Sequence, residues 1–203
     1  MTAIEIRSFP IIRDSGTDWY GGDQEWYPDR WQRMAGCASV AGANLAAFYD
    51  LEMPSAGHIY EKQDFLEIMQ QVYRYMTPGP NGFPHVRKFA EQFCAFAKDR
   101  GRSFAPVIAR DWHDSSTPRD LICRELQDQN PVALLVLRHQ APELEDNNWH
   151  WMTITGYDPD TDRLVLSNCG LRETYAAEAV FAPDRRNEVR LAAFHARQSG
   201  QEL

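Results

Sequence analysis

The sequence has no long apolar stretch and no long basic stretch. No segment approaches the roughly 20 consecutive apolar residues that span a bilayer. The first residues, MTAIEIRSFPIIRDSG, lack the apolar core of a secretory signal. The net charge is -8, and the longest basic runs are only Arg185-Arg186 and Arg100-Gly101-Arg102. We therefore expect a cytoplasmic protein whose partners include neither a membrane nor a nucleic acid.

Cysteine is also scarce. The sequence has only four cysteines, with no C-x-x-C pair: Cys37, Cys94, Cys123 and Cys169. This scatter predicts free thiols and no disulfide framework. Asp111, His113 and His85 are the best candidate metal ligands, but they have neither helical nor zinc-site spacing. The sequence also contains no glycine-rich phosphate loop. We predict no metal and no cofactor.

The residues that are present suffice for a core. Hydrophobic residues make up 43% of the 203-residue chain, which excludes wholesale disorder and fits a single domain, 1–203. Apolar residues recur at helical spacing in four segments: 38–49, 62–76, 85–100 and 117–129. The first 36 residues show no sustained period, so we interpret them as an ordered loop region anchored by aromatic rings.

After residue 130 the period changes to that of strands. The predicted strands cover 132–139, 149–157, 163–168 and 188–196, and the third follows a turn at 158–162. Residues 172–181 are interpreted as a short helix or an irregular connection. Helices followed by strands with short connections predict an α+β fold. Its helical part covers about 30–130, and its antiparallel sheet covers about 131–203.

One cysteine has the context of a nucleophile. Cys37 follows Gly36 and opens the small-residue helix ASVAGANLAAFY. Free N–H groups in the first turn of a helix stabilise a thiolate and can bind an oxyanion. Cys94 and Cys123 lie within amphipathic helices and are interpreted as packed thiols. Cys169 fits either a site neighbour or a core thiol.

A histidine and an asparagine complete the pattern. His150 begins a predicted strand in WHWMTITGY, and Asn168 ends the next strand. Hairpin-connected strands bring such ends close together in a sheet. A helix-start cysteine, a distant strand-start histidine and a strand-end asparagine are the residue types of a nucleophile, its base and an orienting group.

The segments GCASVAGANLAAFYDL, NNWHWMTITGYD and LVLSNCG resemble the Cys, His and Asn blocks of the papain-like cysteine peptidases. The closer likeness is to the compact bacterial branch that trims bacteriocin leader peptides. The resemblance implies a papain-like fold with a central nucleophile helix, no metal, and a peptide or amide substrate. It implies Cys37 as nucleophile, His150 as general base and acid, and Asn168 as the orienting group.

The same resemblance implies a glutamine that helps to bind the oxyanion. Gln32 lies five residues before Cys37 and is favoured because it is nearer, with Gln24, thirteen residues before it, as the alternative. A thiol-dependent acyltransferase of the transglutaminase or arylamine acetyltransferase kind would use the same three residues. A binding protein with a degenerate triad is the third reading. The oligomeric state stays open.

Overall fold

The computed structural model describes residues 2–52, 56–110, 112 and 114–197. Its helices are α1 (Arg30–Ala35), α2 (Cys37–Phe48), α3 (Lys62–Tyr73), α4 (Val86–Lys98), α5 (Ser116–Gln127) and α6 (Ala177–Val180). Three short 3-10 helices also occur: η1 (Gln24–Trp26), η2 (Ala56–His58) and η3 (Pro142–Asn147). The four predicted long helices are confirmed to within three residues at each end. None of the described helices combines the length and the apolar character needed to cross a membrane.

The main sheet is antiparallel throughout. Its strand order is β5-β10-β6-β7-β8-β9, and β1 pairs with the far end of β7. The strands are β1 (Ile4–Glu5), β5 (Phe104–Ala109), β6 (Val132–Arg138), β7 (His150–Asp158), β8 (Arg163–Asn168), β9 (Leu171–Ala176) and β10 (Glu188–Ala196). The predicted α+β class is therefore confirmed.

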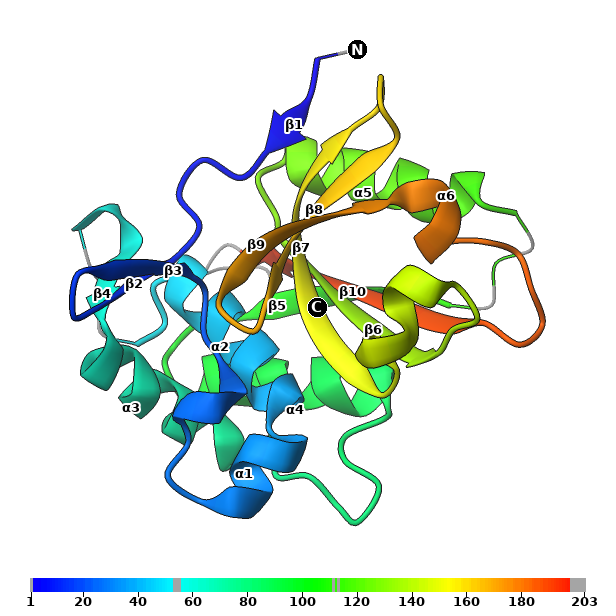
Figure 1. Cartoon of the computed structure of the whole chain (residues 1–203). Helices are drawn as coiled ribbons and strands as arrows, with labels where there is room; N and C mark the ends of the chain where they lie inside the picture. Colours follow the sequence, from blue (N-terminus) through cyan, green and yellow to red (C-terminus); the bar gives the residue numbers. More distant parts are fainter. Residues whose placement is uncertain (1, 53–55, 111, 113, 198–203) are drawn as a thin grey trace.

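Helices cover both faces of this sheet (Figure 1). On one face α2, α3 and α4 enclose a core that includes Phe65, Phe89 and Trp151. On the other face α5 packs with Ile122 and Leu126 against the alternate side chains of the same strands. Every residue of α2 from Cys37 to Ala47 is buried, so α2 is the central helix. Small side chains suit this helix because they let neighbouring elements approach closely on all sides.

The N-terminal region is more regular than its sequence indicates. Residues predicted as loop form a hairpin of β2 (Ile11–Asp14) and β3 (Thr17–Tyr20), and β4 (Ile59–Glu61) pairs with β2 in parallel. The turn residues Ser15 and Gly16 both have positive φ, at 52° and 86°. This is the backbone of a two-residue hairpin turn, and the Ser-Gly dipeptide is its sequence signal.

Two further expectations need correction. The segment 172–181 is neither irregular nor mainly helical, because its first half is the edge strand β9 and only Ala177–Val180 form one helical turn. The hairpin turn Cys169-Gly170, with φ of 46° and 73°, joins β8 to β9. The strand β5 lies within the stretch predicted as helical and pairs with β10 at the edge of the sheet.

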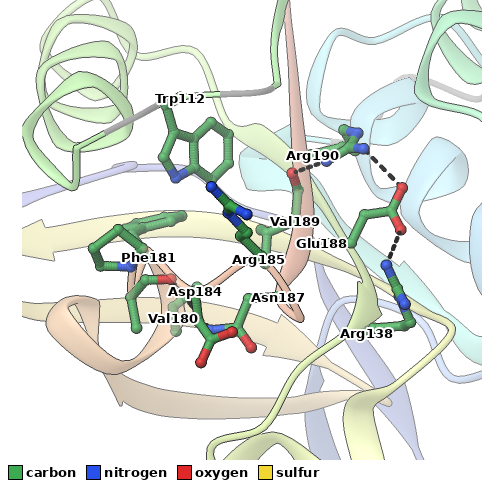
Figure 2. A pocket seen from close by; sticks show the side chains of 12 residues that line it. Trp112, Arg138, Val180, Phe181, Asp184, Arg185, Asn187, Glu188, Val189 and Arg190 are labelled. Atoms are coloured by element: carbon green, nitrogen blue, oxygen red, sulfur yellow. Dashed lines mark hydrogen bonds and ion pairs between the residues drawn. The ribbon is translucent and has the colours of Figure 1, made fainter.

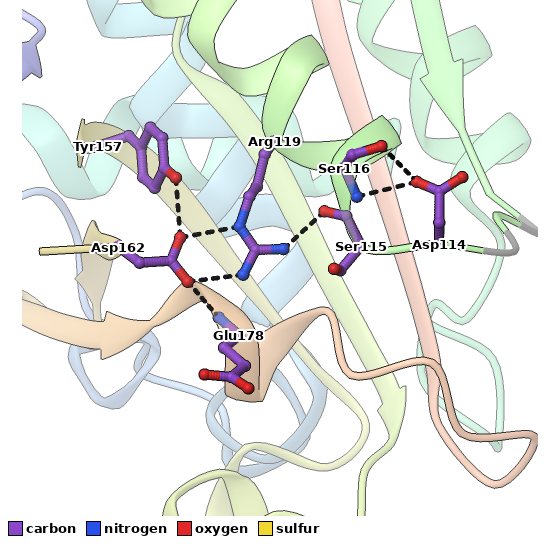
Figure 3. A network of polar contacts seen from close by, with 7 residues as sticks. All are labelled: Asp114, Ser115, Ser116, Arg119, Tyr157, Asp162 and Glu178. Carbon is purple, nitrogen blue, oxygen red and sulfur yellow. Dashed lines mark hydrogen bonds and ion pairs between the residues drawn. The ribbon is translucent and has the colours of Figure 1, made fainter. Parts of the chain in front are cut away.

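A polar cluster fastens α5 to the β7–β8 hairpin (Figure 3). Arg119 donates from Nε and Nη2 to the two carboxylate oxygens of Asp162, at 2.8 and 2.6 Å. Tyr157 and the backbone N–H of Glu178 donate to the same carboxylate. The hydrogen bond from Arg119 lowers the pKa of Asp162. The cluster holds the hairpin that carries His150 and Asn168 against the helix behind the sheet.

Candidate active site

Cys37 is the first residue of α2, and its side chain is only 8% exposed. The first hydrogen bond within the helix runs from Val40 N to Gly36 O, so the N–H groups before it have no carbonyl partner within the helix. Packing around Gly36 leaves no room for a side chain. A Cβ atom there would lie 2.3 Å from the Gln32 carbonyl oxygen and 2.8 Å from the Tyr27 ring.

His150 and Asn168 meet as predicted from their strand positions. His150 begins β7, Asn168 ends β8, and the two strands are paired. Nε2 of His150 lies 2.8 Å from Oδ1 of Asn168. The His150 ring also lines one small cavity with Cys37, and the two groups interact electrostatically. Because Asn168 engages Nε2, we assign the interaction with Cys37 to Nδ1.

These contacts change the acidity of both groups. Burial alone raises the pKa of the Cys37 thiol, but the hydrogen bond and charge of His150 and the N–H groups of Trp151 and Ala38 outweigh it, so that the pKa is lowered. Burial lowers the pKa of His150, yet the contacts with Cys169 and Cys37 raise it to about 10. The arrangement favours a thiolate–imidazolium pair near neutral pH.

A ring of hydrogen bonds fixes the amide of Asn168. Its Nδ2 group donates to Oε2 of Glu173 at 2.9 Å and to Oδ1 of Asn147 at 3.1 Å. Tyr175 donates to the same Glu173 oxygen at 2.7 Å and accepts a bond from Asn147 at 3.1 Å. An ionised carboxylate only accepts hydrogen bonds. Nδ2 must therefore face Glu173, which leaves Oδ1 to accept from His150.

Sequence reasoning did not find Asn147, Glu173 and Tyr175. Glu173 and Tyr175 alternate on one face of β9, the strand that was interpreted as a short helix or irregular connection. The available signal was the Asn168-Cys169-Gly170 sequence, which marks a hairpin turn and therefore a strand after it. Asn147 ends η3, within the segment that was interpreted as a polar loop.

Replacing Glu173 by Gln is expected to slow alkylation of Cys37 at pH 6 by about threefold to tenfold, the effect of up to one pKa unit. The neutral amide removes a negative charge near His150 and permits Asn168 to turn its amide over. Both changes lower the pKa of His150 and leave less thiolate at Cys37. The exposed Glu178→Gln variant has the same charge change and should retain the wild-type rate. Equal rates for the two variants and the wild type would exclude a positioning role for Glu173.

The two glutamines proposed for the oxyanion differ in position. Gln24 lines a cavity of about 10 Å³ together with Cys37, His150 and Cys169, whereas Gln32 lies on α1 and is not among the lining residues. Oε1 of Gln24 is buried and has no hydrogen-bond partner in the described part of the chain. This amide is therefore not fully engaged by the described protein groups, and of the two glutamines it is Gln24 that lines the cavity shared with Cys37.

The loop that carries Gln24 is held by α2. Oδ1 of Asn44 accepts the N–H of Gly22 at 2.9 Å, and its Nδ2 group lies 3.3 Å from Ser167 Oγ and 3.4 Å from Thr153 Oγ1. Gly22 has no room for a side chain, because a Cβ atom would lie 2.6 Å from the ring of Phe65. One buried amide thus links the glutamine loop to the two strands that bear His150 and Asn168.

Cys169 lies at the site, which the sequence left open. Its Sγ atom is 3.8 Å from Nε2 of His150, and the turn that holds it requires positive φ. His150 therefore contacts two thiols. Only Cys37 also begins a long helix. Burial raises the pKa of Cys94 and of Cys123, which fits their interpretation as packed thiols.

In the described ranges, no group of three His, Cys, Asp or Glu side chains is placed to hold an ion. Asp111 and His113 lie outside the described residues. His139, which follows the last residue of β6, is buried, and its Nε2 atom lies 3.2 Å from the carbonyl oxygen of Val180.

An apolar cleft of about 350 Å³ opens beside Cys37. We define it by its large side chains: Trp31, Met34, Phe83, Leu135, Trp149 and Trp151. Met34 is 63% exposed and Trp149 is 58% exposed, so apolar surface faces solvent next to the nucleophile. Trp151 is fixed by stacking on Phe89 and by a 2.8 Å hydrogen bond to the Phe83 carbonyl. The cleft therefore has one rigid wall and an open rim.

No protein-family model matches the chain, and no curated protein is similar enough in sequence to match it. Among solved structures, the chain is similar to the crystal structure of the Pseudomonas avirulence protein AvrPphB, with 13% sequence identity and a TM-score of 0.38. The match covers 79% of this chain and 91% of that chain. A likeness this distant carries no functional argument, and the proposals below rest on the site.

Proposed function

We propose that the chain is a papain-like cysteine hydrolase that cleaves amide bonds in peptides through Cys37, His150 and Asn168. The observation that carries this proposal is that the imidazole of His150 lines one small cavity with the helix-start thiol of Cys37, while its Nε2 atom lies 2.8 Å from the side-chain oxygen of Asn168. Enzymes that transfer acyl groups through a thiol use this arrangement: a nucleophile, a base that contacts it, and a group that orients the base. The sequence likeness of the same three blocks to papain-like peptidases supports it.

In the proposed reaction the Cys37 thiolate attacks the amide carbon. Charge develops on the carbonyl oxygen, where the backbone N–H of Cys37 and the side-chain amide of Gln24 are the proposed donors. The His150 imidazolium donates its proton to the leaving amine, and a thioester remains on Cys37. His150, now neutral, takes a proton from water, whose oxygen attacks the thioester and releases the acid. Asn168 keeps the ring in one orientation throughout.

Alkylation with iodoacetamide tests the proposed nucleophile without a known substrate. The pKa of Cys37 is lowered, whereas the pKa values of Cys94 and Cys123 are raised by burial. The thiolate fraction of an ordinary thiol falls about tenfold per pH unit below its pKa. We expect the Cys37 rate to persist from pH 8 to pH 6 while the other two rates fall about 100-fold. Mass spectrometry of each cysteine-containing peptide gives the rates.

A Cys37 rate that falls in parallel with those of Cys94 and Cys123 would contradict the proposal and favour a degenerate, non-catalytic site. An amine acceptor added to a reaction that cleaves peptides addresses the remaining alternative. Products that carry the amine in place of water would make the chain an acyltransferase that uses the same thioester.

A further inference from the structure

Two cysteines share the small cavity at His150. Of the four cysteines, all of which lie in the described ranges, Cys37 and Cys169 line this cavity of about 10 Å³, whereas Cys94 and Cys123 do not. A cavity of this size holds about one water molecule, so the groups in its wall lie close together. The sulfur of Cys169 is 3.8 Å from Nε2 of the histidine that also interacts with Cys37. The proposed hydrolysis uses Cys37 and leaves the second thiol without a role.

Cys37 can be reached by a small oxidant. It lines both the small cavity and the apolar cleft, whose rim residue Met34 is 63% exposed. Hydrogen peroxide is little larger than water, and it oxidises thiolates in preference to thiols. The pKa of Cys37 is lowered, whereas burial raises the pKa of Cys94 and of Cys123. Peroxide should therefore attack Cys37 before it attacks these two cysteines.

The helix and the strand in the cavity wall are held by their neighbours. Cys37 lies in the buried helix α2, and His150 lies on β7, which pairs with both β6 and β8. Figure 2 shows how β6 is tied in turn to β10, because the carboxylate of Glu188 lies 3.3 Å from Nη2 of Arg138. Cys169 instead occupies the turn before the edge strand β9, which pairs with β8 alone among the described strands. Any adjustment that brings the two sulfurs to the bonding distance of about 2.0 Å therefore comes from this turn.

We propose that Cys169 is a resolving cysteine, which forms a disulfide with Cys37 after hydrogen peroxide has oxidised Cys37 to a sulfenic acid. The disulfide blocks the nucleophile reversibly and protects it from further oxidation to the sulfinic acid, which thiol reductants do not reverse. This role goes beyond the proposed hydrolysis, because it requires a reactive Cys37 but no substrate.

The two steps balance with water as the by-product. In the first step the Cys37 thiolate attacks one oxygen of hydrogen peroxide, the O–O bond breaks, and the departing hydroxide takes a proton from the His150 imidazolium. In the second step Cys169 gives its proton to the neutral His150, and its sulfur attacks the Cys37 sulfur. The S–O bond breaks, and the departing hydroxide takes that proton from His150 and leaves as water. The two thiols lose two electrons, and one peroxide is reduced to two waters.

Treatment of the whole protein with excess hydrogen peroxide tests this role. The remaining thiols are then alkylated, and the protein is digested with trypsin without reduction. The peptides 34–62 and 164–172, which carry Cys37 and Cys169, are expected as a linked pair about 2 Da lighter than the sum of the two free peptides. Dithiothreitol should afterwards restore at least about 80% of the alkylation of Cys37 at pH 6.

The Cys169→Ser variant removes the resolving thiol and keeps a small hydrogen-bonding group beside His150. Excess peroxide should then convert Cys37 to its sulfinic acid, about 32 Da heavier, and dithiothreitol should restore about fivefold less alkylation than in the wild type. Cys123→Ser makes the same atomic change outside the cavity and should give the wild-type result. Alkylation of Cys37 before the addition of peroxide shows that each variant is folded and reactive.

The outcomes separate the two proposals. Equal recovery in Cys169→Ser and in the wild type, or a disulfide from Cys37 to any other cysteine, overturns the resolving role while the hydrolase proposal stands. Conversion of wild-type Cys37 to the sulfinic acid without a linked peptide does the same, and this measurement uses the unaltered chain. A Cys37 that neither peroxide oxidises nor iodoacetamide alkylates at pH 6 overturns both.

Discussion

Replacing Cys37 by Ala is expected to reduce peptide cleavage to background, a loss of at least about 10⁴-fold. Without the sulfur no thioester forms, and the remaining oxyanion donors and His150 give only a small residual rate. Cleavage of peptides in a tryptic digest of a proteome, followed by mass spectrometry, measures the effect. The thermal unfolding midpoint should change little, because only one small buried atom is removed.

Cys169→Ala is the matched control, since both thiols contact His150. Cys169 lies in a hairpin turn and lacks the N–H groups of a helix start, so its variant should keep cleavage within about tenfold of the wild type. If Cys169→Ala abolished cleavage while Cys37→Ala retained it, the nucleophile would be Cys169 and the assignment made here would be wrong.

Replacing His150 by Ala is expected to slow alkylation of Cys37 at pH 6 by about 100-fold or more. Burial by itself raises the pKa of this thiol. The hydrogen bond and charge of His150 are the largest of the effects that lower it. Without the imidazolium the pKa of Cys37 returns towards or above the ordinary thiol value of 9.0, and at pH 6 only about one thiol in a thousand is then ionised. The rate should recover as the pH is raised towards 9.

The direction in which the alkylation rate changes with pH follows from the pKa shifts of Cys37 and His150. The thiolate–imidazolium pair forms above the lowered pKa of Cys37 and persists until His150 loses its proton near pH 10. Wild-type alkylation should therefore be flat from pH 6 to 8, and that of His150→Ala should rise about tenfold per unit. Added imidazole should restore part of the rate at pH 6. If Cys37 in the His150→Ala variant were alkylated at the wild-type rate, the role of His150 in the proposed pair would be contradicted.

Much of the site could be predicted because its three central residues lie at the ends of regular elements. Small residues after Cys37 indicate a helix, and the strands of His150 and Asn168 have clear alternation and a short turn between them. Their proximity then follows from hairpin geometry. The predicted bounds of β8 and β10 agree with the structure for the same reason.

The parts of the site that the sequence did not predict depend on contacts between segments that are distant in sequence. The position of the loop that carries Gln24 depends on Asn44, which binds the Gly22 backbone from 22 residues away. Spacing to Cys37 carries no information about this bond. The strand β9 was missed because it is an edge strand with mostly polar side chains, and its Glu173 and Tyr175 act on Asn168 only after the hairpin has closed.

The buried amide of Asn44 has a consequence for how reactivity should be lost. It joins a loop near residue 22, the middle of α2 and the strands β7 and β8 within one hydrogen-bonded unit. Partial unfolding of any of these segments separates the Cys37 thiol from the His150 imidazole. The reactivity of Cys37 and the folded structure should therefore be lost in a single denaturant transition. Acid-pH alkylation of one cysteine would then serve as a sensor of the entire folded molecule.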